Sequence, residues 1–178
     1  DKENLSALLE KGKTMSYLNR ENEAIETYDK ILNKQPKHNS VLYYKGKSLL
    51  NNRKYENAIS YFDKAIEIDP QYYEAYCQKG IALSILKPNE SVSYFDKAIE
   101  INPQYYEAYY QKGLVLLQNK KYNDAITCFD NALAINPFDS NVIYQKGLVL
   151  YKDEKYNDAI ICFDKIFAIG PIDSIKPN

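Results

Sequence analysis

Few residues in this chain could carry out catalysis. His38 is the single histidine, so a Ser/His/Asp or Cys/His arrangement would have to use it. It follows Pro36 by two residues, in an expected loop, and is interpreted as a surface residue. The chain also contains no glycine-rich phosphate-binding loop. The sequence therefore predicts a protein that is not an enzyme, with no catalytic residue and no cofactor.

The three cysteines do not have the spacing of metal ligands. Cys128 and Cys162 precede Phe129 and Phe163 at equivalent positions of a repeat, unlike the C-x2-C spacing of a zinc site. Cys77 is interpreted as a plain small residue. An odd number of cysteines without a disulfide framework favours a reducing compartment, so we expect a cytoplasmic protein without a metal site.

Five aspartates could suggest a metal or acid–base site. Because each lies about one repeat from the next, their carboxylates should be separated rather than converge, and we expect them on a solvated outer face. They are Asp29, Asp63, Asp96, Asp130 and Asp164.

Charge and hydropathy exclude further classes of function. Lys+Arg number 23 and Asp+Glu 24, a formal net charge of -1, whereas proteins that bind nucleic-acid phosphates usually carry a basic excess. No apolar run approaches the ~20 residues that a membrane-spanning helix needs. We therefore expect neither a nucleic-acid nor a membrane partner. The 45% of hydrophobic residues predicts a folded chain.

Glycine and proline reveal an internal repeat of about 34 residues. The glycines recur at Gly12, Gly46, Gly80, Gly113 and Gly147, and the prolines at Pro36, Pro70, Pro103, Pro137 and Pro171. Two residue classes with one period indicate a repeat architecture. The predicted units are 5–38, 39–72, 73–105, 106–139 and 140–173, forming a single array over 5–173, with a tail at 174–178.

Each unit contains two segments with helical periodicity. In the fourth unit, the first segment begins at Tyr106, and Tyr109, Gly113 and Leu116 share one face. The second begins at Tyr122 and has an apolar stripe at helical spacing. The proline that follows disfavours helical geometry in its predecessor and ends this helix. The sequence therefore predicts an all-α fold of helix pairs.

The third unit is one residue short. We place its deletion in the turn between its two helices, with Pro88 in the first turn of the second helix, where proline is tolerated. On this reading Val92 occupies the position that holds alanine in the other units.

Small residues are expected where helices approach closely. A glycine inside a helix costs about 1 kcal/mol relative to alanine, so its recurrence needs a packing reason. The facing site on the second helix is expected to hold Ala24, Ala58, Ala125 and Ala159, with an aromatic series filling the space between units. That series is Tyr28, Phe62, Phe95, Phe129 and Phe163.

The unit resembles the tetratricopeptide repeat, whose pattern is an aromatic, Leu-Gly, Tyr, Ala-x3-Phe and Pro over 34 residues. The fourth unit shows this pattern in Tyr109, Gly113, Leu116, Ala125, Phe129 and Pro137. The resemblance implies a right-handed superhelical α-solenoid of antiparallel helix pairs, whose first helices line a concave groove for a protein partner.

The chain departs from the family pattern just before each glycine. All five units have lysine instead of leucine there, and we expect these side chains to lie along apolar surface with their amines in water. They are Lys11, Lys45, Lys79, Lys112 and Lys146.

The resemblance also identifies candidate groove residues by position. They are Tyr43, Tyr44, Lys47, Gln78, Ile81, Tyr110, Gln111, Leu114, Tyr144, Gln145 and Leu148, with Lys13 adding a second cation near the N-terminal end. Tyrosine offers rigid amphipathic surface and glutamine can pair with an extended backbone, so the pattern favours a peptide or partner segment. The Lys and Asn clamp with which some family members bind chaperone C-termini is absent, because Leu9 and Lys13 occupy its first positions.

Other interpretations remain open from the sequence. Glutamine and lysine beside the glycines could be solvated or could bridge neighbouring units. A structural self-assembly scaffold is the main alternative, because Ile160, Phe163, Ile166, Phe167 and Ile169 form a last apolar stripe that no polar helix follows. That stripe predicts either a further helix or a homodimer through the terminal helices.

Overall fold

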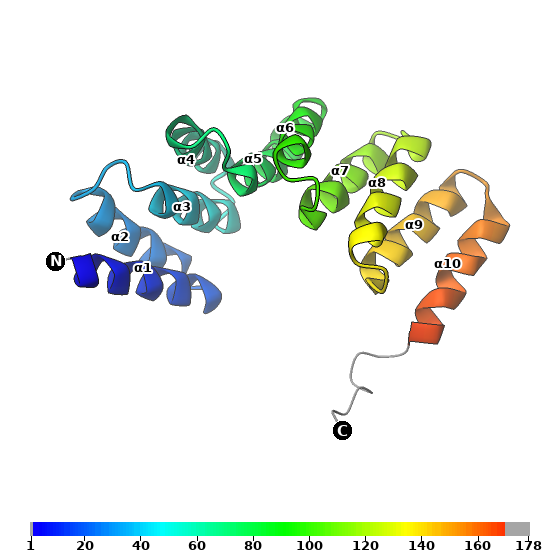
Figure 1. Ribbon diagram of the computed structural model, residues 1–178, viewed down its shortest axis with the longest axis horizontal. Helices are drawn as coiled ribbons and strands as arrows, with labels where there is room; N and C mark the ends of the chain where they lie inside the picture. The colour runs from blue at the N-terminus through cyan, green and yellow to red at the C-terminus, as the bar shows by residue number, and fades with distance from the viewer. Residues whose placement is uncertain (1, 170–178) are drawn as a thin grey trace, which may run out of the picture. The chain divides into compact units, whose positions relative to one another are not determined.

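The computed structural model describes residues 2–169, which form ten helices (Figure 1). The helices are α1 (Lys2–Tyr17), α2 (Glu21–Leu32), α3 (Asn39–Asn51), α4 (Tyr55–Ile68), α5 (Tyr73–Leu86), α6 (Pro88–Ile101), α7 (Tyr106–Gln118), α8 (Tyr122–Ile135), α9 (Ser140–Lys152) and α10 (Tyr156–Ile169). No strand occurs within 2–169, and consecutive helices form pairs, as the sequence predicts. The expected tail and the end of the fifth unit, with Pro171, lie outside the described residues.

The chain divides into two compact units. The first, Asp1–Ile101, contains the three helix pairs from α1 to α6, and the second, Asn102–Asn178, contains the two pairs from α7 to α10. Within each unit, every helix packs against its partner in the pair, and successive pairs pack through the second helix of one and the first helix of the next. This packing buries apolar faces that a single pair would leave exposed.

In four repeats, a residue in the left-handed backbone conformation follows the first helix. Asn19, Arg53, Lys120 and Glu154 have φ between 57° and 60°. The amide after each of them donates to a carbonyl five residues back, as Lys121 N does to Leu116 O at 2.9 Å. This hydrogen bond satisfies a carbonyl at the helix end and turns the chain sharply into the second helix.

The third repeat has no such left-handed turn. Helix α5 extends to Leu86 and α6 begins at Pro88, so the missing residue comes from the turn, as predicted. The prediction for the alanine position is wrong, however. Ser91 is completely buried there, four residues before Phe95, while Val92 is only half-buried. A deletion before the second helix shifts the register of that helix by one residue.

Each recurring glycine lies against the aromatic ring of its own repeat. A Cβ atom added to Gly113 would meet the Cε1 atom of Phe129 at 2.6 Å, and the other four glycines show the same contact with their rings. The expected close approach is therefore present. The group nearest the glycine is this ring, however, and not the alanine that the sequence suggested.

Lys45, Lys79 and Lys146, before three of the glycines, do not simply extend into water, which corrects the sequence-based expectation for them, whereas Lys11 is exposed. Lys45 Nζ donates to Asp29 Oδ1 of the preceding repeat. Lys79 and Asp63 form the same pair, as do Lys146 and Asp130. These aspartates are roughly half exposed, so they are partners of the next repeat's lysine as well as surface residues.

Candidate functional site

The predicted groove residues lie on the first helices of four repeats. Within the first unit they are Tyr43, Tyr44 and Lys47 on α3 and Gln78 and Ile81 on α5. Within the second unit they are Tyr110, Gln111 and Leu114 on α7 and Tyr144, Gln145 and Leu148 on α9. Each unit therefore presents its own candidate surface.

The first unit has a small pocket between α1 and α3. Its volume is about 140 Å³, and it brings together Tyr44 with Lys13 and Lys47, the two lysines expected near the N-terminal end of the groove. The ammonium of Lys13 lies 5.2 Å from the centre of the Tyr44 ring. The pocket also includes residues that the sequence analysis missed, namely Ser16, Tyr17, Tyr28 and Asn51.

Acidic groups balance the positive charge of this pocket. Lys13 donates to Glu10 at 2.9 Å, and this hydrogen bond raises the pKa of Lys13. Ser16 and Asn51 both donate to the carboxylate of Glu21, at 2.8 and 2.7 Å. The pocket is therefore polar and mixed in charge rather than a simple anion site.

The other predicted residues of the first unit differ in accessibility. Tyr43 is buried in the core, with its ring centre 5.0 Å from that of Tyr72, so it offers little surface to a partner. Gln78 and Ile81 are half-buried and partly accessible. The repeat register identifies a position on the helix but not how deeply its side chain is covered.

Tyr110 belongs to an aromatic and polar network in the second unit. Its ring stacks on Tyr106 with centres 6.3 Å apart, and the Tyr106 hydroxyl donates to Asp139 at 2.6 Å. Burial raises the pKa of both tyrosines, and the charge of Glu107 contributes, so both are protonated phenols at neutral pH. Gln111 donates to Glu107 at 2.7 Å. The hydrogen bonds hold this surface in one arrangement.

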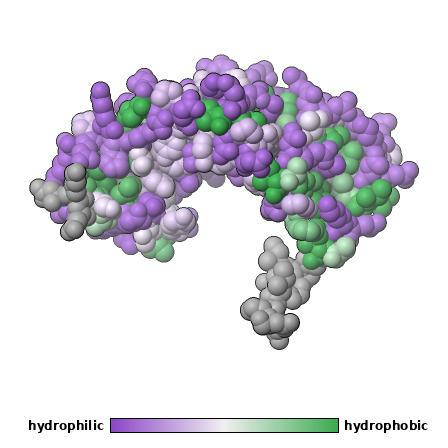
Figure 2. Space-filling model, in the orientation of Figure 1, coloured by the Kyte–Doolittle hydropathy of each residue, from purple (hydrophilic) through white to green (hydrophobic). Residues whose placement is uncertain are grey.

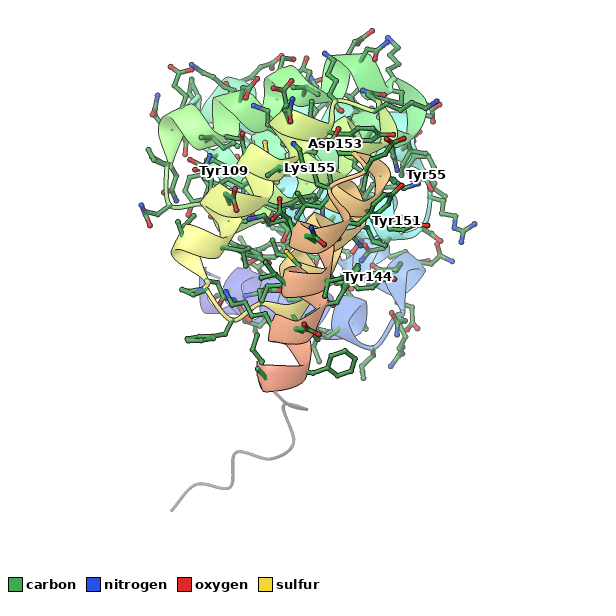
Figure 3. The ribbon with its side chains drawn as sticks, turned by 90° about the vertical axis from the view of Figure 1, so that its right-hand side faces the viewer. Tyr55, Tyr109, Tyr144, Tyr151, Asp153 and Lys155 are labelled. Atoms are coloured by element: carbon green, nitrogen blue, oxygen red, sulfur yellow. The ribbon has the colours of Figure 1, made fainter. Side chains whose placement is uncertain are left out.

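Tyr144 is the most accessible of the predicted groove tyrosines. It is 48% exposed, and its ring lies 6.0 Å from that of Phe163. Figure 3 shows Tyr144 beside α10, with Tyr151 on the same side of the unit. Leu114, Gln145 and Leu148 are half-buried. This surface of the second unit therefore combines accessible aromatic, amide and apolar groups.

The described residues contain no candidate metal site. Within them, no three His, Cys, Asp or Glu side chains gather as metal ligands. His38 lies at the N-terminal boundary of α3 and is half-buried. None of the helices in this part of the chain is long and apolar enough to cross a membrane.

Helix pairs that stack through the second helix of one and the first helix of the next define a helical repeat protein. Family models described as tetratricopeptide repeat match residues 6–38, 40–72, 61–90 and 106–139. These matches cover more than half of the chain, which belongs to the tetratricopeptide repeat family. The resemblance identified from the sequence is therefore confirmed.

Solved structures of tetratricopeptide-type folds resemble the chain along nearly its whole length. A MamA structure has a TM-score of 0.80 at 23% identity, covering 95% of this chain and 93% of its own. YrrB, described as a TPR protein with an unusual peptide-binding site, has a TM-score of 0.72 at 23% identity, covering 93% and 86%. A thermophilic TPR protein from Thermus thermophilus has a TM-score of 0.79 at 18% identity, covering 95% and 93%. No curated protein matches the chain.

Proposed function

We propose that this protein is a non-enzymatic interaction module or adaptor that binds an extended peptide or partner segment on its first helices. The family is a protein-interaction fold, which supports the general class. The proposal places the protein in the cytoplasm, with another protein as its partner and with neither nucleic acid nor membrane as a ligand.

One observation carries the proposal most directly. Tyr110, Gln111 and Leu114 on α7 recur one repeat later as Tyr144, Gln145 and Leu148 on α9, and all six are accessible at least in part. Such a surface matches the chemistry of an extended chain, whose side chains pack on tyrosine while its backbone pairs with glutamine.

The fixed arrangement of this surface favours binding. The ring of Tyr110 is held between Tyr106 and Phe129, and Tyr144 packs on Phe163. A side chain that is already ordered loses little rotamer entropy when a partner binds. The pocket of Lys13, Tyr44 and Lys47 offers a second, polar surface on the first unit.

The test is a binding measurement with a peptide selected from a display library against the full chain. Tyr110→Ala combined with Tyr144→Ala should weaken its affinity at least tenfold, because truncated aromatic anchors typically cost about 2 kcal/mol. Helicity should stay nearly unchanged. Fluorescence anisotropy of the labelled peptide gives the Kd.

A control pair comes from the same unit. Tyr122→Ala with Phe138→Ala removes one tyrosine of a second helix and one exposed loop aromatic, and it should leave the affinity within twofold. Equal affinity of the wild-type protein and the Tyr110/Tyr144 variant would refute the groove assignment.

Self-assembly through the terminal repeats is the second candidate. Ile160 and Phe167 on α10 are 56% and 82% exposed, and hydrophobic residues gather over the last helices in Figure 2. An exposed apolar face of this kind favours association. Sedimentation velocity at several concentrations distinguishes the two: a dimer that Phe167→Glu abolishes supports assembly, and a persistent monomer supports peptide binding.

A further inference from the structure

A tyrosine ring covers the first lysine–aspartate pair between repeats. Lys45 Nζ pairs with Asp29 and also donates to the hydroxyl of Tyr61 at 2.7 Å. The same ammonium lies 4.3 Å from the centre of the Tyr61 ring. Burial favours the neutral amine, but the hydrogen bonds to Asp29 and Tyr61 outweigh it and raise the pKa of Lys45.

The second pair has the same arrangement one repeat later. Lys79 pairs with Asp63, and its ammonium lies 4.3 Å from the centre of the Tyr94 ring. The side chains of Lys45 and Lys79 are only 8% and 12% exposed. A tyrosine just before the core phenylalanine thus shields the lysine in two repeats.

The ring of Tyr61 also completes an apolar cluster. Tyr61 packs against the core of the first unit together with Ile25, and Leu49 is buried in the same cluster. The position therefore has two features that suit a phenol: an apolar wall for the ring and an ammonium for the hydroxyl.

In the second unit the pair is present but the tyrosine is not. Lys146 pairs with Asp130 at 2.5 Å, and Cys162 stands where Tyr61 and Tyr94 stand in their repeats. The Lys146 side chain is 24% exposed, two to three times the value for the covered lysines. A cysteine is too short to extend over the ammonium.

The missing ring leaves a hollow of about 530 Å³ between α8 and α10. Ile126 and Leu150, the counterparts of Ile25 and Leu49, line it beside Lys146 and Cys162. Burial raises the pKa of the Cys162 thiol, which is therefore protonated and suited to an apolar contact.

The rim of the hollow can engage a polypeptide. Asn123, Lys155 and Asp158 contribute polar groups, and Lys155 donates to Asn123 at 3.3 Å. Figure 3 shows Lys155 at the start of α10, beside α8. Ile161 lines the hollow and is 65% exposed. In the repeat that contains Tyr61, the equivalent position holds the polar residue Ser60.

We propose that this hollow binds a tyrosine side chain presented by a partner protein. The ring lies against Ile126 and Leu150, and its hydroxyl accepts a hydrogen bond from Lys146, as the hydroxyl of Tyr61 does from Lys45. Ile161 adds apolar contact at the rim. The site uses none of the proposed groove residues, so it goes beyond the peptide-binding function proposed above.

The test uses two probes on the full chain, p-cresol and the capped peptide acetyl-Gly-Tyr-Gly-amide. Titration followed by ¹H–¹⁵N NMR should shift the amides of Ile126, Leu150 and Cys162 for both probes. The phenylalanine analogue of the peptide should bind at least threefold more weakly, because it cannot accept the hydrogen bond from Lys146.

Cys162→Tyr builds the proposed occupant into the chain. It should raise the Tm by about 2–4 °C and weaken binding of both probes at least tenfold. Cys162→Ser is the matched control, because it keeps the hollow open and should retain binding within twofold. Circular dichroism establishes that each variant is folded.

A second variant keeps the test decisive if Cys162→Tyr does not fold. Lys146→Met should abolish the preference for the tyrosine peptide over its phenylalanine analogue while leaving binding of the latter within twofold. Retained preference in Lys146→Met, or full binding in a folded Cys162→Tyr variant, would overturn the proposal.

Other occupants give distinct results. Binding of p-cresol without binding of the peptide would indicate a small-molecule pocket and overturn the partner assignment. Self-association that Cys162→Tyr abolishes would assign the site to a second copy and also overturn it. The Tyr110/Tyr144 variant should bind both probes normally, so failure of the groove proposal and failure of this one are distinguishable.

Discussion

At the scale of single residues, Tyr28 shows how one added oxygen changes a core position. It occupies the place of phenylalanine in the other four repeats, with its ring against Gly12. The Tyr28 hydroxyl is buried and has no hydrogen bond of normal geometry. Ser48 lies near this hydroxyl and lowers the pKa of Tyr28 slightly, against the larger effect of burial. A buried hydroxyl without a partner costs about 1–3 kcal/mol.

We expect Tyr28→Phe to stabilise the protein and to reduce its sensitivity to alkali. Removing the buried hydroxyl should raise the free energy of unfolding by about 1 kcal/mol at pH 7. Burial, with smaller effects from Glu21 and other acidic groups, raises the pKa of Tyr28 above its ordinary value. Because the pKa of Tyr28 is raised in the folded state, its contribution to stability is complete below the unfolded-state pKa of about 10. The contribution is lost progressively as the pH rises from there toward the folded-state pKa.

Urea unfolding of both proteins at pH 7, 9 and 10.5 measures this effect. The stability difference in favour of Tyr28→Phe should be constant to pH 9 and widen at 10.5. Tyr17→Phe is the control, because Tyr17 is highly exposed and the substitution should change little at any pH. A difference that narrows at high pH would contradict the burial argument.

At the scale of elements, the turns within repeats decide how each helix pair closes. Lys120 adopts φ 59°, a left-handed conformation that costs a residue with a side chain about 1 kcal/mol. Glycine adopts the same conformation without this cost but loses more backbone entropy on folding. The chain thus places strain in the turns at Arg53, Lys120 and Glu154, whereas Asn19 tolerates this conformation and the shortened third repeat avoids it.

Lys120→Gly should therefore stabilise the protein modestly. The expected gain is about 0.5 kcal/mol, the difference between relieved strain and greater chain entropy, and it should raise the Tm by roughly 1–2 °C. Lys121→Gly is the matched control, because Lys121 has φ -85° and should lose stability on substitution. Thermal unfolding followed by circular dichroism at 222 nm gives both values; a stabilising Lys121→Gly would contradict the explanation.

At the scale of the whole molecule, stability in a repeat array depends on how many neighbours each helix has. Helix α8 buries Ala125, Cys128, Phe129 and Ala132, whereas in α10 Ala159 is the only buried residue. The last described helix therefore lacks the packing that the equivalent helix one repeat earlier receives.

Amide hydrogen exchange should show this difference directly. The backbone amides of α10 should exchange at least tenfold faster than those of α8 at low protein concentration, because opening α10 exposes less apolar surface. Mass spectrometry of peptides from the two helices measures the rates. Equal protection that persists on dilution would show that α10 is covered, in conflict with its exposed face.

Particular residues show how far the sequence alone could go. The glycine and proline spacing predicted the helix pairs, the shortened third turn and the family. It did not predict that Tyr43 is buried while Tyr144 is exposed, although both lie three residues before a glycine. Burial depends on neighbours beyond the helix that carries the residue, such as Tyr72 at the N-terminal boundary of α5 against Tyr43 on α3, and the period cannot specify them.

The sequence by itself determined the repeat, because a 34-residue period imposes the same local helix, turn and close contact each time. Only the tertiary structure decided which side chains from successive repeats meet. Lys146 and Asp130 lie 16 residues apart on successive helices and meet only through packing, and the open hollow beside Cys162 exists because packing brings three helices together there. Local propensity follows from neighbouring residues, whereas a site between repeats depends on contacts that form only when the helices stack.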